Sequence, residues 1–224
     1  MLKFIITYLS IFFIGCSYNT VKTKNYDFIQ GDIPIILNVS HDGPKEFNYT
    51  SKRKDSTDNF NIKNDMYTRN IAVNIFNKIK KSTGKSPTLL INNIHRKFVD
   101  LNREPEEAYE SFRAKVIYNR YHTVLQNEIF RQLQIHDKVY LFDIHGFYSK
   151  NIDIVISTRN HSTITKKDIE KLFQNDFSFY NNIISKGFEV RLDDPFYGGY
   201  IIKNFKNVNV SAIQIEIERK IRTS

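Results

Sequence analysis

Five short apolar runs, each about as long as a β-strand, are spaced along this chain. They cover residues 33–39, 88–91, 139–144, 152–158 and 212–217. Most are separated by longer segments with helical signals, and such alternation is typical of parallel strands, whose connections must be long enough to hold a helix. These crossovers bury both faces of the sheet. The order of elements therefore predicts an α/β fold, a three-layer αβα architecture with a largely parallel or mixed central sheet.

Three segments carry the helical signals. The first opens at Asp65, and its apolar side chains recur at intervals of three and four residues. These side chains are Ala72, Ile75, Phe76 and Ile79. A long helix is predicted from Pro105 to about His136, because proline is favoured in the first turn of a helix. Another helix begins at Thr165, and Gly146 is expected to turn the chain between the third and fourth apolar runs.

The first residues have the three-part pattern of a secretory signal. Lys3 supplies a positive charge, residues 4–14 are almost wholly apolar, and Cys16 follows a glycine. Eleven residues are too few to span a hydrocarbon core, which needs about 20. Residues 13–16, Phe-Ile-Gly-Cys, resemble a bacterial lipobox, although phenylalanine stands where leucine is usual. The resemblance implies that residues 1–15 are removed and that Cys16 is lipidated. An ordinary cleaved leader with an incidental cysteine is the alternative.

The remaining chain is expected to consist of a tether, residues 16–30, and one domain, residues 31–224. Residues 48–63 are polar without periodicity and are expected to form a mobile loop. Because Cys16 is the only cysteine, packing and not disulfides must hold the domain. The formal net charge of +9 suits anionic lipid or an acidic wall polymer, and nucleic acid is a less suitable partner for an exported chain. We therefore expect a membrane-anchored lipoprotein of the bacterial cell envelope.

Residues that can bind a metal or act as a base follow three of the apolar runs directly. The segments are Ser40-His41-Asp42-Gly43, Asp143-Ile144-His145-Gly146 and Gln214-Ile215-Glu216. Since ligands bind at the ends of strands in an α/β sheet, these segments are expected to converge. Their combination is the layout of a zinc hydrolase site. Taken singly, His145 could be a hydrogen-bonded interior histidine and Glu216 a salt-bridged strand residue.

Several segments together resemble the N-formylglutamate amidohydrolase family over nearly all of the mature chain. They are Asn38-Val39-Ser40-His41-Asp42-Gly43, Asp65, His95-Arg96-Lys97-Phe98-Val99-Asp100-Leu101-Asn102-Arg103, Asp143-Ile144-His145-Gly146, Gly198-Gly199-Tyr200-Ile201 and Ala212-Ile213-Gln214-Ile215-Glu216. This family is distantly similar to zinc carboxypeptidases and cell-wall amidases. The resemblance implies a phosphorylase/hydrolase-like fold with zinc bound by His41, Asp65 and His145. It also implies that Glu216 is the catalytic carboxylate.

The chemistry of amide hydrolysis needs these residue types. Three nitrogen and oxygen ligands leave an open position on zinc, where the pKa of a bound water falls to about 7. Glu216 would take the proton of this water and pass it to the departing amine. Asp143 precedes His145 by two residues on a strand, so it points to the same face and is expected to orient a loop or a ligand.

Cationic residues are expected to hold a carboxylate of the substrate. Asn102 and Arg103 are adjacent, and in the carboxypeptidase-like scheme such a pair binds this group. Arg96 is a second candidate, either for the carboxylate or for the developing oxyanion, and a solvated loop position is its alternative. Tyr200 follows two glycines and is expected to close over the site.

These residues and the family resemblance together lead us to expect a zinc-dependent amidohydrolase that cleaves an N-acyl amino acid, of which N-formylglutamate is one, or a cell-envelope peptide. The formylglutamate-hydrolysing members of the family act in cytoplasmic histidine breakdown, whereas this chain is expected to be exported. A substrate of the envelope is therefore as plausible as formylglutamate. A non-catalytic surface-binding lipoprotein that retains the fold is the alternative. The presence of His41, His145, Asp65 and Glu216 together argues against it, because a binding module needs no catalytic carboxylate beside a metal.

Overall fold

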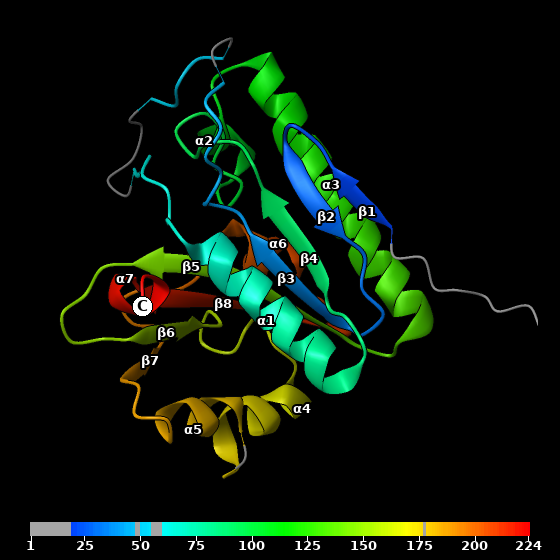
Figure 1. The fold of residues 1–224 in the computed structure, drawn as a ribbon, viewed down its shortest axis with the longest axis vertical. Coiled ribbons are helices and arrows are strands. Elements are labelled where there is room, and N and C mark those ends of the chain that lie inside the picture. Colours follow the sequence, from blue (N-terminus) through cyan, green and yellow to red (C-terminus); the bar gives the residue numbers. More distant parts are fainter. Residues whose placement is uncertain (1–18, 48–49, 55–59, 177) are drawn as a thin grey trace, which may run out of the picture.

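A mixed sheet forms the centre of the protein, whose computed structural model describes residues 19–47, 50–54, 60–176 and 178–224. The strand order is β1-β2-β4-β3-β5-β8-β6-β7 (Figure 1). The strands are β1 (Thr20–Lys22), β2 (Tyr26–Ile29), β3 (Ile35–Val39), β4 (Thr88–Asn92), β5 (Val139–Phe147), β6 (Ile154–Ser157), β7 (Val190–Leu192) and β8 (Val210–Glu218). Strands β4, β3, β5 and β8 run parallel, whereas β1, β2 and β6 make antiparallel pairs. This topology confirms the predicted α/β fold.

Helices cover both faces of the sheet. They are α1 (Thr68–Thr83), α2 (Pro105–Ala108), α3 (Phe112–Ile135), α4 (Lys166–Ile169), the π-helical η1 (Glu170–Gln174), α5 (Phe179–Ile184), α6 (Tyr200–Phe205) and α7 (Arg219–Arg222). In Figure 1, α1 crosses the front of the sheet, and α3 lies behind it. Helix α6 packs on the α3 face, whereas α4, η1 and α5 cover the other face near β6. Within the described residues, no helix is both long and apolar enough to cross a membrane.

Alternate side chains of the central strands enter the two apolar layers. In β5, Leu141 packs beneath α3, and Ile144 packs beneath α1. In β8, Ala212 and Ile217 divide between the same two layers. Burial of one large aliphatic side chain contributes about 1.5–3 kcal/mol to folding. The sheet is therefore fixed from both sides, which holds the carboxyl ends of its parallel strands in place.

Residues 20–29 belong to the sheet and not to the tether expected over residues 16–30. Strands β1 and β2 form an antiparallel hairpin, and β2 pairs with β4 so that Phe28 lies opposite Leu90. Tyr26 and Phe28 also pack against the core beneath α3. Two aromatic residues are too short a pattern to predict a strand, but the edge of β4 supplies the backbone partners that complete it. The expected leader, residues 1–15, and Cys16 lie outside the described residues.

The long helix predicted from Pro105 to about His136 is divided into α2 and α3. Tyr109 has an extended backbone and ends α2. The Ser111 hydroxyl then accepts a hydrogen bond from Ala114 N at 3.2 Å and caps α3. Such a cap satisfies a backbone donor that the first turn of a helix leaves free, so α3 begins as an independent element.

Gly146 lies within β5 and not in the turn that the sequence predicted. A Cβ atom at this position would lie only 2.3 Å from Arg222 Cζ. The Arg222 guanidinium donates to Phe147 O at 3.0 Å and to Ile217 O at 2.9 Å. Glycine at this position leaves room for the Arg222 side chain to approach the strand closely. A glycine in a sequence can mark either a turn or such a close approach, and the sequence alone did not distinguish the two.

Candidate metal centre and active-site cleft

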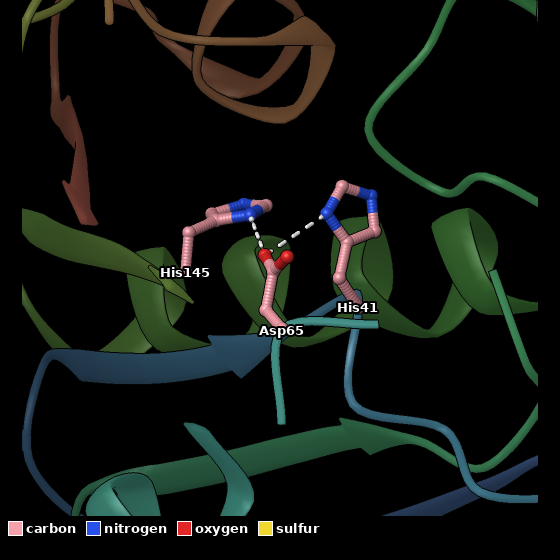
Figure 2. Close-up of side chains that lie close together, drawn as sticks. All are labelled: His41, Asp65 and His145. Carbon is pink, nitrogen blue, oxygen red and sulfur yellow. Dashed lines mark hydrogen bonds and ion pairs between the residues drawn. The ribbon is translucent and has the colours of Figure 1, made fainter. Parts of the chain in front are cut away.

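His41, Asp65 and His145 meet at the carboxyl edge of the parallel strands (Figure 2). His41 follows β3, His145 lies in β5, and Asp65 precedes α1. Asp65 Oδ2 is 3.3 Å from His41 Nδ1 and 3.0 Å from His145 Nδ1. All three residues are buried, and one ligand atom from each lies within 4.8 Å of the others. Two imidazoles and one carboxylate in this arrangement are donors that suit zinc.

The other ring nitrogen of each histidine faces a second carboxylate. His41 Nε2 is 2.6 Å from Asp100 Oδ1, and His145 Nε2 is 2.7 Å from Asp143 Oδ2. We assign the proton of each ring to Nε2, which then donates to the carboxylate and leaves the Nδ1 lone pair for a metal. Within the described chain, His41 Nδ1 is buried and makes no hydrogen bond. The residues present therefore fit a metal ion bound between the two Nδ1 atoms and Asp65.

Electrostatics favour a positive charge at this point. Burial alone would raise the pKa of Asp65, but the neighbouring rings of His145 and His41 outweigh burial and lower it. Burial would likewise lower the pKa of His145, but Asp143 and Asp65 raise it well above its ordinary value. The carboxylates around the two rings thus stabilise a bound cation, either a proton or a metal ion.

Asp100 is a site residue to which the sequence analysis gave no role. It is fully buried, and besides His41 it accepts from Arg96 Nε at 2.8 Å and from Arg53 Nη1 at 3.1 Å. Burial would raise the pKa of Asp100, but Arg96 and His41 hold it well below its ordinary range. Asp100 therefore joins two guanidinium groups to a candidate metal ligand. Its place two residues before Asn102 was the only signal that the sequence offered.

Arg53 lies within residues 48–63, which were expected to form a mobile loop. Its side chain is buried, and it also donates from Nε to Glu107 O at 3.0 Å and from Nη1 to Asn61 O at 3.1 Å. In the described residues of this stretch, 50–54 and 60–63, the backbone is irregular but this side chain anchors it to the site. Nothing in the sequence indicated that Arg53 is buried, because a charged side chain in a polar segment is usually exposed. Burial of the Arg53 guanidinium is favourable because Asp100 compensates its charge.

Glu216 lies beside His145 on the neighbouring strand. The register of β5 and β8 places these two residues opposite each other. Gln214 is on the same face of β8 and donates from Nε2 to Glu216 Oε1 at 2.8 Å. Burial raises the pKa of Glu216 above its ordinary value, although His145 and other nearby cations oppose this effect. A raised pKa brings a carboxylate closer to the range that suits a general base near neutral pH.

The candidate metal ligands open into a cleft of about 800 Å³. Its lining contains every residue that the sequence analysis placed against the substrate: Arg96, Asn102, Arg103 and Tyr200, together with Glu216. Arg96 is buried, and its Nη1 lies 3.7 Å from Asp65 Oδ1, so it is not the solvated loop residue of the alternative interpretation. Tyr200 begins α6, where its ring lies 6.2 Å from that of Tyr118. Closure by Tyr200 stays a prediction.

Asn102 faces the cleft, but the protein itself binds its amide. The side-chain oxygen accepts from Ile201 N at 2.8 Å, and the nitrogen donates to Gln214 Oε1 at 3.0 Å. Gln214 Oε1 also accepts from Gly199 N at 2.9 Å. A Cβ atom on Gly199 would lie 2.3 Å from Asn102 Nδ2, so glycine is needed for this contact. Asn102 thus connects the segment after β4 to β8 and α6, and direct binding of a substrate by Asn102 stays a prediction.

Comparisons with known proteins agree with the fold. A family model described as N-formylglutamate amidohydrolase matches residues 111–222, a range that includes His145 and Glu216. The crystal structure of N-formylglutamate amidohydrolase from Ralstonia eutropha JMP134 resembles this chain with a TM-score of 0.67 at 14% sequence identity, covering 88% of this chain and 87% of that one. The crystal structure of gene product Atu2144 from Agrobacterium tumefaciens has a TM-score of 0.62 at 15% identity, covering 90% and 88%. No curated protein sequence matches the chain. At these identities the two structures show likeness of fold.

Proposed function

This chain belongs to the N-formylglutamate amidohydrolase family, and we propose that it is a zinc-dependent enzyme that cleaves the amide bond of an N-acyl amino acid or of a cell-envelope peptide. One observation carries the proposal. The buried carboxylate of Glu216 lies opposite His145, at a cleft that also exposes two further candidate metal ligands, His41 and Asp65. A metal site next to a base is the arrangement that metal-assisted hydrolysis requires.

His41, Asp65 and His145 would hold the ion through two imidazole Nδ1 atoms and a carboxylate oxygen. Zinc in such a site supplies Lewis acidity and lowers the pKa of water to about 7. Asp100 and Asp143 would fix the tautomer and the orientation of the two rings, because each accepts the proton of an Nε2 atom.

Glu216 would act as the general base. Gln214 holds its Oε1 atom, so we assign the proton transfer to Oε2. This oxygen would accept a proton from the water that attacks the amide carbonyl and would then deliver it to the nitrogen of the departing amine. Such a group is not a metal ligand, so its loss should affect turnover and leave metal binding intact.

Two arginines have different proposed roles. Arg96 is fixed by Asp100 next to Asp65, so it is placed to stabilise the negative charge that develops on the carbonyl oxygen. Arg103 is half-buried at the side of the cleft and is proposed to bind the carboxylate of the amino acid. Because that carboxylate is present in both ground and transition states, Arg103→Ala should mainly raise KM and leave zinc content unchanged.

The proposed location is the bacterial cell envelope, with the lipid anchor on Cys16. This part of the proposal depends on the leader pattern of residues 1–16 and on the excess of basic residues. Under this proposal the natural substrate is an amide that occurs outside the cytoplasm. A surface-binding lipoprotein without turnover is the competing function.

Metal analysis combined with an amidase assay tests the proposal. We expect purified protein to contain one zinc ion per chain and to hydrolyse at least one compound from a panel of N-acyl amino acids and muropeptides. A chelator should remove this activity, added zinc should restore it, and Glu216→Gln protein should serve as the inactive control. A zinc-loaded protein that binds a compound of the panel but hydrolyses none would support the competing function and refute the enzyme.

A further inference from the structure

The outward face of α3 carries large apolar side chains that the fold leaves exposed. Phe112 is 79% exposed, Val116 44% and Phe130 65%. Val116 lies about one turn after Phe112, and Phe130 lies five whole turns after it, at 3.6 residues per turn. The three side chains therefore leave the helix on one side, opposite Tyr121 and Leu125, which pack in the core. We call these three residues the α3 stripe.

Exposed cations flank the α3 stripe. They are Arg113, Lys115 and Arg120. The only acid of α3, all of which is described, is Glu128, and it is buried and lies 2.7 Å from Arg131. The outward face of α3 thus combines apolar side chains with positive charge alone. Helices that lie in the surface of an anionic bilayer have this combination, because apolar burial and attraction to lipid phosphates add together.

The N-terminal segment leaves the domain beside the same helix. Gln30 N donates to Asn19 O at 3.1 Å, and Arg131 Nη2 donates to Gly31 O at 2.6 Å. The first described residue therefore lies near the last turns of α3, and Figure 1 shows β1 alongside this helix. Cys16, the proposed site of acylation, precedes Asn19 by only three residues, which can span at most about 11 Å. A lipid on Cys16 would thus keep α3 within reach of the bilayer.

Contact of α3 with a bilayer would leave the active-site cleft accessible. Among the described residues that line the cleft, none belongs to α3. The helix covers one face of the sheet, whereas the candidate metal ligands lie at the carboxyl edge of the parallel strands. Contact through the α3 stripe would therefore orient the domain on a membrane without covering the site.

We propose that the α3 stripe and its flanking cations dock on an anionic lipid bilayer. This inference goes beyond the proposed hydrolysis and rests on the proposed location in the cell envelope. A second copy of this chain is a less suitable occupant. In a symmetric dimer the same face of both copies would meet, which brings like charges together at a cost in free energy.

Tryptophan fluorescence tests the contact directly, because the chain contains no tryptophan and one substitution supplies a single reporter. The protein is the chain from residue 16 onward with Cys16→Ser, which keeps every described residue and bears no acyl group. The probes are vesicles of equal parts phosphatidylglycerol and phosphatidylcholine. We expect the emission of Phe112→Trp and of Phe130→Trp protein to shift to shorter wavelength with these vesicles, because the indole enters an apolar environment.

Val208→Trp is the matched control for the reporter. Val208 is 86% exposed and lies between α6 and β8, away from α3. Its emission should not shift with the same vesicles. Phosphatidylcholine vesicles, which have no net charge, should shift the emission of Phe112→Trp and Phe130→Trp protein much less than the anionic vesicles do.

Co-sedimentation with the anionic vesicles measures the apolar contribution. The double variant Phe112→Ser with Phe130→Ser should lower partitioning by about 10-fold for each phenylalanine, the lower limit for burial of such a side chain. Val208→Ser removes an equally exposed apolar side chain elsewhere and should change partitioning by less than about two-fold.

The charge contribution is measured in the same assay. Lys115→Gln with Arg120→Gln should lower partitioning by about 5-fold for each cation. The control is Lys166→Gln with Lys167→Gln, which removes two exposed cations from α4 on the other face of the sheet. This control should lower partitioning by less than about two-fold, because charges beyond a Debye length of the membrane are screened.

The inference is refuted if the emission of Phe130→Trp protein does not shift, or if the serine double variant partitions as the parent does. It is also refuted if the parent chain is a dimer without lipid and the serine double variant is a monomer, since the occupant would then be a second copy. The tryptophan variants keep a large apolar side chain, so they test the contact even if serine weakens the fold.

Failure of the other proposals would give different results. The vesicle assays use a chain without acyl groups, so they do not depend on whether Cys16 is lipidated in the cell. The serine double variant should keep the kcat and KM of the parent for a soluble amide, because the cleft contains no residue of α3. A chain that docks through α3 and hydrolyses no amide would refute the enzyme and retain the membrane surface.

Discussion

The substitution Asp100→Asn would keep the shape of a side chain at the centre of the site and remove its charge. Asp100 is fully buried and accepts from His41, Arg96 and Arg53 at 2.6, 2.8 and 3.1 Å. Removal of one partner of a buried ion pair typically costs about 3–5 kcal/mol, because the remaining charge stays buried. Asparagine can still accept hydrogen bonds, so we expect the free energy of unfolding to fall by about 3 kcal/mol, the lower end of this range.

The same substitution should weaken zinc binding. Loss of the outer carboxylate partner of a metal-binding histidine typically lowers metal affinity by about 10- to 100-fold. Asparagine would no longer hold His41 in the tautomer that directs Nδ1 to the metal. The two effects are measured by urea unfolding of the chelator-treated protein and by competition of the zinc-loaded protein with a chromophoric chelator.

Asp194→Asn is the matched control, since it removes the same charge from the exposed pair with Arg191, 2.9 Å apart. Exposed pairs contribute about 0–1 kcal/mol, so this variant should unfold almost as the wild type does. If Asp100→Asn also stayed within that margin and kept its zinc affinity, then Asp100 would neither compensate the arginines nor orient His41, and our description of the site would be wrong.

Other substitutions separate metal binding, chemistry, folding and anchoring. His145→Ala should abolish zinc binding in metal analysis, because two protein ligands rarely hold a catalytic zinc ion. Glu216→Gln should retain zinc and lower turnover by roughly 10²-fold or more in the amidase assay. Asp168 is buried and paired with Lys138, which helps lower its pKa against the effect of burial. Asp168→Asn should therefore cost about 1.5–3 kcal/mol in urea unfolding at pH 7. This difference should shrink as the pH falls below the unfolded-state pKa of about 3.9 and through the lower folded-state pKa. Cys16→Ser should leave unprocessed precursor or released soluble protein in cell fractionation, because that thiol is the proposed site of acylation.

Each of these predictions has an outcome that contradicts it. Full zinc occupancy in His145→Ala would remove the ligand assignment, and wild-type turnover in Glu216→Gln would remove the proposed base. A stability difference for Asp168→Asn that did not change with pH would show that its charge does not stabilise the fold. For Cys16→Ser, unchanged mature mass and membrane partitioning would exclude lipidation at this residue.

Most of the fold was predictable from local pattern. The apolar run that precedes His41 became β3, the run that contains Glu216 became β8, and the segment with three-residue and four-residue spacing around Ala72 became α1. These signals are readable because backbone geometry repeats every two residues in a strand and every 3.6 in a helix. The rule that parallel strands end at one edge then predicted that His41, His145 and Glu216 converge, and the structure brings them together.

What the local pattern did not reveal depends on partners that are distant in sequence. Strand β2 exists because the edge of β4 pairs with it, although its own aromatic pattern is only two residues long. The buried ion pair of Arg53 and Asp100 joins residues 47 positions apart. The carboxylate of Asp193 accepts a hydrogen bond from the backbone N–H of Arg159, which lies 34 positions earlier in the sequence. Sequence analysis predicts that a charged side chain is exposed to solvent unless its oppositely charged partner is known. Burial of such a side chain becomes favourable only when the fold brings the two charges together. The sequence alone therefore determined the layers of the fold and the edge that bears the candidate site, whereas tertiary structure decided which charges are buried there and which partners compensate them.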